Sequence, residues 1–496
     1  MKRIKMRSNN SQKFFIKIVL LAIFVASNLG AQNKPELNCF TVIVGKEVSQ
    51  DGCVTIGHNE DDYGKQCVNI YKTPSQTHSE TEKVTFFNEG KINQVKTTNG
   101  FIWVQLPGMQ VADSYVNDKG VLITSNGCPS IEDKPDSTDG GILYWIRRLV
   151  AERATTAKEG AKLAGKLIDS YGYVSAGRTY TIADKNEAWV LSAVYGKHWV
   201  AQRVPDNQVA VIPNYYTIGE INLKDTLNFL GSKDIVSYAE KRGWYKPGGK
   251  SKFNFAKAYT ALTSINHPGN INRIWRGISL LSKEEFKIDE DLPFSFIPYK
   301  KLDIQDIMTV LRDHYELSDL DKSELYKNGD PHKKNYATIC SESTQYSFVA
   351  QLRQNMPIEI GTLIWFTYFR PAAHTYTPIY LGINKFPDQF AFTDFASAIK
   401  NHLTPPESIF DTNSTLAYRD FVKTVNRIDN NFGENFPKVK NQNSFYENNL
   451  IRETKNFESQ VLKIYNENPE LAFRMINDYS NKKLIELRNN VRSVLN

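Results

Sequence analysis

Cys39 is the residue whose position in this sequence suggests covalent chemistry. It follows Asn38 and comes directly before Phe40 to Val44, a run rich in β-branched residues. If the chain before it is removed, Cys39 carries a free α-amine with a reference pKa of about 8. That amine can accept the thiol proton at neutral pH, so one residue supplies both nucleophile and base. The position predicts attack on a carbonyl by Cys39 once the Asn38–Cys39 bond is cut.

Two other interpretations of Cys39 are open from its position. A lipid-anchor cysteine needs small residues directly before it and an adjoining apolar run, whereas Glu36, Leu37 and Asn38 follow a polar spacer here. A buried structural thiol is the common state of cysteine in general. Position therefore argues against the anchor and leaves a catalytic or a structural thiol.

The first 31 residues have the order of a secretory signal peptide. Six Lys and Arg come first, then the apolar run Ile18 to Val25, then Leu29, Gly30 and Ala31. The apolar run is about half of the roughly 20 residues that a spanning helix needs. We expect a signal peptide over 1–31, a short propeptide over 32–38 and export to the periplasm or the extracellular space, without stable membrane insertion after signal removal.

Charge and length narrow the class of protein. Residues 1–31 hold six basic residues and no acidic one, so their removal lowers the formal net charge from +7 to +1. Without a basic surface, the term that dominates nucleic-acid affinity has no source, and no nucleic-acid partner is expected. The remaining chain can bury a sizeable globular core. Its five cysteines, an odd number, leave at least one free thiol in an exported protein.

The elements that must hold Cys39 begin with a predicted hairpin. Residues 40–44 and 54–57 are short β-type runs separated by a loop with the turn signal Asp51-Gly52. A second hairpin is predicted over 114–116 and 121–124 around a tight turn. Thr156 and Glu159 predict a capping box that opens a second helix after one over 142–149. Strands are predicted again over 180–183, 188–192, 198–204 and 209–212. This order favours antiparallel sheets with segregated helices.

Several blocks of the sequence resemble one family in order along the chain. They are CFTVIVGKEVSQDG, VNDKGVLITSN, IADKNEAWVL, GGKSKFNFAKAY, RIWRGISLL, LRDHY and WFTYFRP. The chain thereby resembles, over about residues 39 to 380, the N-terminal-nucleophile dipeptidases of the dipeptidase A and secernin group, which are related to the choloylglycine hydrolases. The resemblance implies a four-layer αββα sandwich, an α+β fold, over 39–384. Spacings such as Phe457, Val461 and Tyr465 predict that 385–496 form a helical region packed on that core.

The resemblance also implies roles for single residues. Cys39 matches the nucleophile, and Asp61 the carboxylate near its thiol and amine. Asn126 matches the amide that donates to the oxyanion, a type of group often worth several kcal/mol in a transition state. Asn214 matches the asparagine that binds the nucleophile's amine. Arg273 matches the arginine that completes the site and binds substrate, with Arg276 as its rival.

Two positions depart from the family pattern. His58 stands where relatives carry Arg before an Asn-x-Asp sequence, and Leu317 replaces an expected glycine. Arg has a permanent charge and five donors, while His titrates near neutrality and has two ring nitrogens. We expect His58 to take the place of the arginine in substrate binding.

The function implied is hydrolysis of dipeptides through a thioester. One alternative keeps the site and changes the substrate to N-acyl amino acids or conjugated acids, and another is a secreted binding protein without activity. The sequence lacks His-x-x-x-His, Cys-x-x-Cys, EF-hand and Walker patterns, so neither a metal nor a cofactor is expected. The expected partners are dipeptides or other small amides, and a homo-oligomer stays open.

Overall fold

The computed structural model describes residues 38–62, 68–86, 90–105, 111–248, 252–321, 337–391 and 415–494. The chain divides into two units, Met1–Glu36 and Leu37–Asn496, and every described residue belongs to the second. The predicted signal peptide, residues 32–37 of the predicted propeptide and Cys67 lie outside the described residues. The signal peptide and the propeptide therefore stay predictions.

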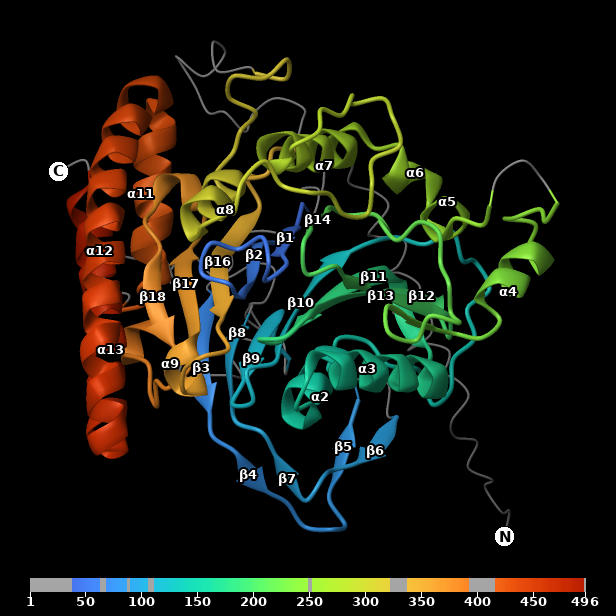
Figure 1. Ribbon diagram of the computed structural model, residues 1–496, viewed down its shortest axis with the longest axis horizontal. Coiled ribbons are helices and arrows are strands. Elements are labelled where there is room, and N and C mark those ends of the chain that lie inside the picture. The colour runs from blue at the N-terminus through green and yellow to red at the C-terminus, as the bar shows by residue number, and fades with distance from the viewer. Residues whose placement is uncertain are drawn as a thin grey trace, which may run out of the picture. The chain divides into compact units, whose positions relative to one another are not determined.

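Two antiparallel sheets form the centre of the unit (Figure 1). The six-stranded sheet has the order β14 (Val209–Ile212), β1 (Phe40–Val44), β2 (Val54–Asp61), β16 (Thr344–Leu352), β17 (Thr362–Tyr368) and β18 (Thr377–Tyr380). The eight-stranded sheet has the order β15 (Phe229–Gly231), β13 (Trp199–Val204), β12 (Ala188–Gly196), β11 (Tyr173–Ala183), β10 (Leu122–Gly127), β9 (Ser114–Asn117), β8 (Phe101–Gln105) and β3 (Asn69–Thr73). Two small ribbons pair β4 (Gln76–Thr77) with β7 (Thr97–Thr98) and β5 (Lys83–Thr85) with β6 (Lys91–Asn93).

Helices cover the outer face of each sheet. The eight-stranded sheet carries α2 (Trp145–Arg153) and α3 (Ala157–Tyr171), and the six-stranded sheet carries α7 (Pro268–Leu281) and α8 (Ile304–Leu311). Shorter helices are α4 (Ile235–Lys241), α5 (Phe255–Tyr259), α6 (Leu262–Ile265) and α9 (Ile358–Gly361), and the C-terminal helices are α11 (Tyr418–Asn430), α12 (Phe432–Glu467) and α13 (Pro469–Ser493). Single 3₁₀ turns cover Pro371–Ala373 and Asp388–Phe390.

Three apolar clusters separate four layers. One lies between α2, α3 and the eight-stranded sheet, as with Leu149, Ala161 and Ile182. The second fills the space between the sheets, where Ile56 and Val190 are buried. The third lies between the six-stranded sheet, α7, α8 and the C-terminal helices. This is the predicted four-layer αββα sandwich, and the α+β class is confirmed.

Local sequence signals form the predicted elements. β1 pairs with β2 and β9 with β10, as the two hairpin predictions require. Thr156 caps α3 by accepting a hydrogen bond from the Glu159 amide. The reciprocal half of the capping box is displaced by one residue, because the Glu159 carboxylate accepts from the amide and hydroxyl of Thr155. Gly172 ends α3 with φ = 78°, in the left-handed region that glycine tolerates.

The C-terminal helices pack on the outer cluster of the six-stranded sheet. Val461 of α12 and Ile476 and Tyr479 of α13 belong to the outer cluster of that sheet. Among the described residues, no helix has the length and apolar character to cross a membrane. The division into a 39–384 domain and a 385–496 helical region stays a prediction, since the helices share a core with the sheet.

Candidate active site

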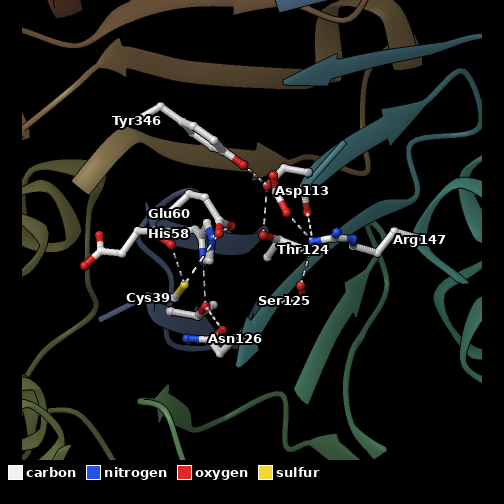
Figure 2. Close-up of polar contacts among 12 residues, drawn as sticks. Cys39, His58, Glu60, Asp113, Thr124, Ser125, Asn126, Arg147 and Tyr346 are labelled. Carbon is white, nitrogen blue, oxygen red and sulfur yellow. Dashed lines mark hydrogen bonds and ion pairs between the residues drawn. The ribbon is translucent and has the colours of Figure 1, made fainter. Parts of the chain in front are cut away.

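The Cys39 thiol lies between the two sheets, at the start of β1. The residue is 3% exposed. Its Sγ lies 3.5 Å from Glu60 Oε1 and 3.5 Å from the backbone oxygen of Asp61. Thr41, two residues on and therefore on the same face of β1, reaches Asn126 of the opposite sheet. Figure 2 shows Cys39, Glu60, His58 and Asn126 grouped in this layer.

Arg273 joins the predicted site residues from the helix side. The helix α7 starts with Pro268 at its first turn, a favoured position. The fully buried Arg273 guanidinium donates through Nη1 to the carbonyl oxygens of Asn38 (2.7 Å) and Cys39 (3.0 Å). Its Nη2 donates to Asn214 Oδ1 at 2.9 Å. One side chain therefore holds both the Cys39 backbone and Asn214.

Arg276, the rival arginine, has a different partner. It forms a forked ion pair with Asp313, with Nε and Nη2 contacts of 2.8 to 3.1 Å, and its Nη2 also donates to the backbone oxygen of Glu316. Of the two arginines, it is Arg273 whose described contacts include Cys39.

Both predicted asparagines lie at the ends of strands and connect to the Cys39 segment, Asn126 through Thr41 and Asn214 through Arg273. Asn126, buried on β10, donates through Nδ2 to the Ile212 carbonyl at 3.1 Å and accepts from Thr41 at 2.7 Å through Oδ1. Asn214 follows β14 and donates to the carbonyl of Gly127 at 2.9 Å. Asn214 thus ties the end of β10 to Arg273.

Asp61 is close to Cys39, but its carboxylate accepts hydrogen bonds from serine hydroxyl groups and not from the thiol. Asp61 Oδ2 accepts from Ser341 Oγ at 2.5 Å and from Ser343 Oγ at 3.1 Å. Burial raises the pKa of this carboxyl, while the Ser341 hydrogen bond and the charge of Arg273 act to lower it. The contact between Asp61 and the thiol is made by the backbone carbonyl.

His58 is fully enclosed, with a partner at each ring nitrogen. Nδ1 lies 2.8 Å from Thr41 Oγ1, and Nε2 lies 3.0 Å from Glu60 Oε2. Burial, with a further contribution from Arg147, lowers the pKa of His58 to about 3. The expectation that His58 binds substrate in place of the family's arginine does not fit this geometry, because both nitrogens are engaged inside the protein.

Glu60 is the site residue that the sequence did not predict. Its carboxyl contacts the Cys39 thiol through one oxygen and His58 through the other. Burial raises its pKa well above the usual range, and Asp113 adds to this, against Arg147 and Arg178. The two-residue spacing from His58 on a strand was the available signal, because it places both side chains on one face.

Burial keeps the thiol protonated in the chain with an intact Asn38–Cys39 bond. It raises the pKa of Cys39 well above its usual value, and Glu60 and Asp61 add to this increase wherever their carboxyls are ionised. Burial disfavours the charged form of any group, so a thiolate here needs a nearby positive partner.

Three further features of the described residues bear on the chemistry: the state of the cysteines, the capacity to bind a metal ion and the position of a cavity. The cysteines 39, 53, 128 and 340 are all buried and free. No group of three His, Cys, Asp or Glu among the described residues could hold a metal ion. A cavity of ≈ 690 Å³ has a lining that includes Tyr215, next to Asn214, and Ile274, next to Arg273. Among the described residues, the thiol's hydrogen bonds go to Glu60 and Asp61, and neither residue lines this cavity.

A family model agrees with this chain over most of its length. The model of peptidase family C69 matches residues 112–449. The chain belongs to peptidase family C69. This peptidase is therefore a hydrolase of peptide bonds, as the sequence predicted. The match contains Asn126, Asn214 and Arg273 and begins after Cys39, His58 and Asp61.

Relatives of the C69 peptidase are similar over about three quarters of the chain. A probable dipeptidase of Latilactobacillus sakei is 25% identical over 376 residues, which cover 73% of this chain and 78% of the relative. A probable dipeptidase of Salmonella dublin is 26% identical over 377 residues, or 70% of this chain and 82% of the relative.

Two solved structures are also similar. Penicillin V acylase from Agrobacterium tumefaciens has 13% identity and a TM-score of 0.33, over 69% of this chain and 85% of its own. A mutant of conjugated bile acid hydrolase from Clostridium perfringens has 12% identity and a TM-score of 0.34, over 69% of this chain and 92% of its own.

Proposed function

We propose that this C69 peptidase is an exported dipeptidase whose nucleophile is Cys39, active once residues 1–38 are removed. The observation that carries the proposal is the contact set of Arg273, which gathers the Cys39 backbone and Asn214 from segments more than 170 residues apart. The names of the relatives, probable dipeptidases, support the substrate class.

In the proposed reaction, the freed α-amine of Cys39 takes the thiol proton and the thiolate attacks the scissile carbonyl. The Asn126 amide supplies a hydrogen bond to the oxyanion. Among the described residues its Nδ2 has one acceptor, the Ile212 carbonyl, so its second hydrogen is available. The ammonium returns its proton to the leaving amine. Water then hydrolyses the thioester, which splits one difficult step into two.

Asp61 supports the role of the amine. Its Oδ1 is buried with no hydrogen-bond partner among the described residues, and Asp61 stands on β2 beside the start of β1. A buried carboxylate oxygen without a donor is costly, and an ammonium group at Cys39 would supply one. Removal of the preceding chain thus satisfies Asp61 and creates the base.

The mature N-terminus and a single variant test the proposal. The mass of the mature, exported protein should correspond to a chain that starts at Cys39; a fully active preparation that starts at Gln32 would contradict it. Cys39→Ala should abolish dipeptide hydrolysis while the protein stays folded, and retained activity would exclude Cys39 as nucleophile.

The same preparation decides the substrate class. Free dipeptides and N-acyl amino acids are assayed side by side with wild type and Cys39→Ala. Hydrolysis of dipeptides supports the proposal. Hydrolysis of N-acyl amino acids alone would make the protein an amidase that uses the same site.

A further inference from the structure

A continuous row of hydrogen bonds runs from the Cys39 thiol to the Asn126 amide. Cys39 Sγ contacts Glu60 Oε1 at 3.5 Å, and Glu60 Oε2 contacts His58 Nε2 at 3.0 Å. His58 Nδ1 contacts Thr41 Oγ1 at 2.8 Å, and Thr41 Oγ1 contacts Asn126 Oδ1 at 2.7 Å. All five residues are at most 3% exposed, and Figure 2 shows Cys39, Glu60, His58 and Asn126 along this row. The row joins the proposed nucleophile to the proposed oxyanion donor.

The far end of the row fixes the direction of its hydrogen bonds. The Ile212 carbonyl can only accept, so the Asn126 NH₂ group faces it and Oδ1 faces Thr41. An amide oxygen can only accept, so the Thr41 hydroxyl donates to it. The Thr41 oxygen must then accept from His58, which therefore carries a hydrogen on Nδ1.

The contact between His58 and Glu60 holds one further proton. A carboxylate oxygen and an unprotonated Nε2 are both acceptors and would repel each other at 3.0 Å. One of the two groups must therefore carry a proton that lies between them. It belongs either to an imidazolium or to a carboxylic acid. Burial lowers the pKa of His58 to about 3 and raises that of Glu60, which places the proton on Glu60 and makes the contact a neutral hydrogen bond rather than an ion pair.

Charged and titratable groups on the surrounding elements act on this pair. Those that act on Glu60, His58 or both are Cys39 before β1, Asp62 after β2, Asp113 before β9, Arg147 on α2, Arg178 on β11 and Tyr346 on β16. Asp113 and Arg147 form an ion pair of 2.7 Å and act on the pKa of Glu60 in opposite directions. Arg178 favours an ionised Glu60, but the desolvation of a fully enclosed carboxyl outweighs it.

We propose that Glu60 is a positioning residue that stays a neutral carboxylic acid, donating to His58 Nε2 and accepting the Cys39 thiol hydrogen, and that the row orients Asn126 through His58 and Thr41. The proposal rests on the proposed function in taking Cys39 as nucleophile and Asn126 as oxyanion donor. A carboxylate 3.5 Å from Sγ would oppose thiolate formation, whereas a neutral acid adds no charge there. Histidine in the arginine's place makes this possible, because arginine has no acceptor for the Glu60 hydrogen.

The proton positions can be measured without any assay of activity. In the full-length protein labelled with ¹⁵N-histidine, the His58 signals are those lost in His58→Gln. We expect a protonated Nδ1 and an unprotonated Nε2 throughout the range from about pH 5 to about pH 8. A protonated Nε2 in that range, as imidazolium or as the other tautomer, would overturn the proposal. This result stands whether or not dipeptides are substrates.

Two substitutions of Glu60 test its positioning role. Gln has the shape of the neutral acid, with an NH₂ group for His58 and an oxygen for the thiol, while Leu has similar size and neither group. We expect kcat/KM on a dipeptide, or on whichever amide the enzyme cleaves, to fall by about threefold or less in Glu60→Gln and by about tenfold or more in Glu60→Leu. Wild type should lose activity at a lower alkaline pH than Glu60→Gln, which cannot ionise. Equal losses in the two variants would overturn the proposal.

Discussion

Arg273 Nη1 lies 2.7 Å from the carbonyl oxygen of Asn38, which is the carbonyl of the Asn38–Cys39 peptide bond. The same nitrogen donates to the Cys39 carbonyl at 3.0 Å. A guanidinium on this oxygen polarises the bond whose cleavage would free the Cys39 amine. Arg273 is therefore placed to act in the proposed cleavage of this bond as well as in the proposed active site.

Arg273→Lys should slow both processing and catalysis. Lysine is a point charge without the planar fork, so it cannot keep the Asn38, Cys39 and Asn214 contacts together. We expect kcat/KM to fall by about 100-fold, the scale for loss of an aimed donor, and unprocessed chain to accumulate. Intact mass spectrometry over time gives the fraction of chains that start at Cys39.

The matched control is Arg276→Lys, the same change three residues along α7. It weakens the forked pair with Asp313 and should lower the free energy of unfolding with little effect on processing. If the Asn38–Cys39 bond were cleaved equally slowly in both variants, the contact of Arg273 with the Asn38 carbonyl would have no specific role in processing.

Asn126→Asp should lower kcat far more than it changes KM. The substitution keeps the shape but turns the NH₂ group into an oxygen that faces the Ile212 carbonyl, and it removes the proposed donor to the oxyanion. We expect a fall in kcat of about 100- to 1,000-fold, measured by steady-state kinetics on a dipeptide. Asn186→Asp makes the same chemical change at an exposed turn and should leave kcat within about twofold. An Asn126→Asp enzyme with a raised KM and a normal kcat would point to ground-state binding instead.

Local signals were enough to predict the elements that carry Cys39 and Asn126. The hairpin that starts at Cys39 and the hairpin whose second strand carries Asn126 depend on residues only a few positions apart, as does the cap at Thr156. Each depends on turn or capping chemistry that neighbouring residues supply without help from the rest of the fold.

Long-range pairing could not be predicted in this way. β14 lies beside β1, and β16 beside β2, across about 170 and 290 residues of chain. No strand was predicted over 344–380, although β16, β17 and β18 complete the sheet. Glu60 was missed for a related reason, because its partner Cys39 lies opposite it on another strand and only the register brings the two together.

Thr41→Val should reduce activity more than Thr41→Ser. Valine has the shape of threonine but has no hydroxyl to link His58 Nδ1 with Asn126 Oδ1, whereas serine retains that hydroxyl. We expect kcat to fall by about tenfold in Thr41→Val and by about threefold or less in Thr41→Ser. Thermal unfolding of both variants separates this effect from lost packing. A serine variant as impaired as the valine variant would show that the methyl group matters, not the hydroxyl.

The His58–Glu60 pair should give stability a distinctive pH dependence. In the unfolded chain Glu60 titrates near 4.5 and His58 near 6.5, while in the folded chain the pKa of Glu60 is raised and that of His58 is about 3. Between these two unfolded values, both states hold one proton on the pair, as Glu60-COOH when folded and as His58⁺ when unfolded. The contribution of the pair to the free energy of unfolding is therefore flat there.

Outside the range between these two unfolded pKa values, the free energy of unfolding changes with pH. The direction of that change depends on whether the folded or the unfolded state binds more protons. Above pH 6.5 the folded pair holds one proton more, so stability falls as pH rises; below pH 4.5 the unfolded pair holds one more, so stability falls as pH falls towards 3. Each limb has a limiting slope of about 1.4 kcal/mol per pH unit. The free energy of unfolding is measured with urea for wild type and for the double variant Glu60→Gln/His58→Gln, from about pH 3.5 to about pH 9. The difference between the two proteins at each pH gives the contribution of the pair. A difference that rises or falls steadily between the two unfolded pKa values would mean that the folded pair does not hold a single proton, and the neutral hydrogen bond between Glu60 and His58 would have to be abandoned.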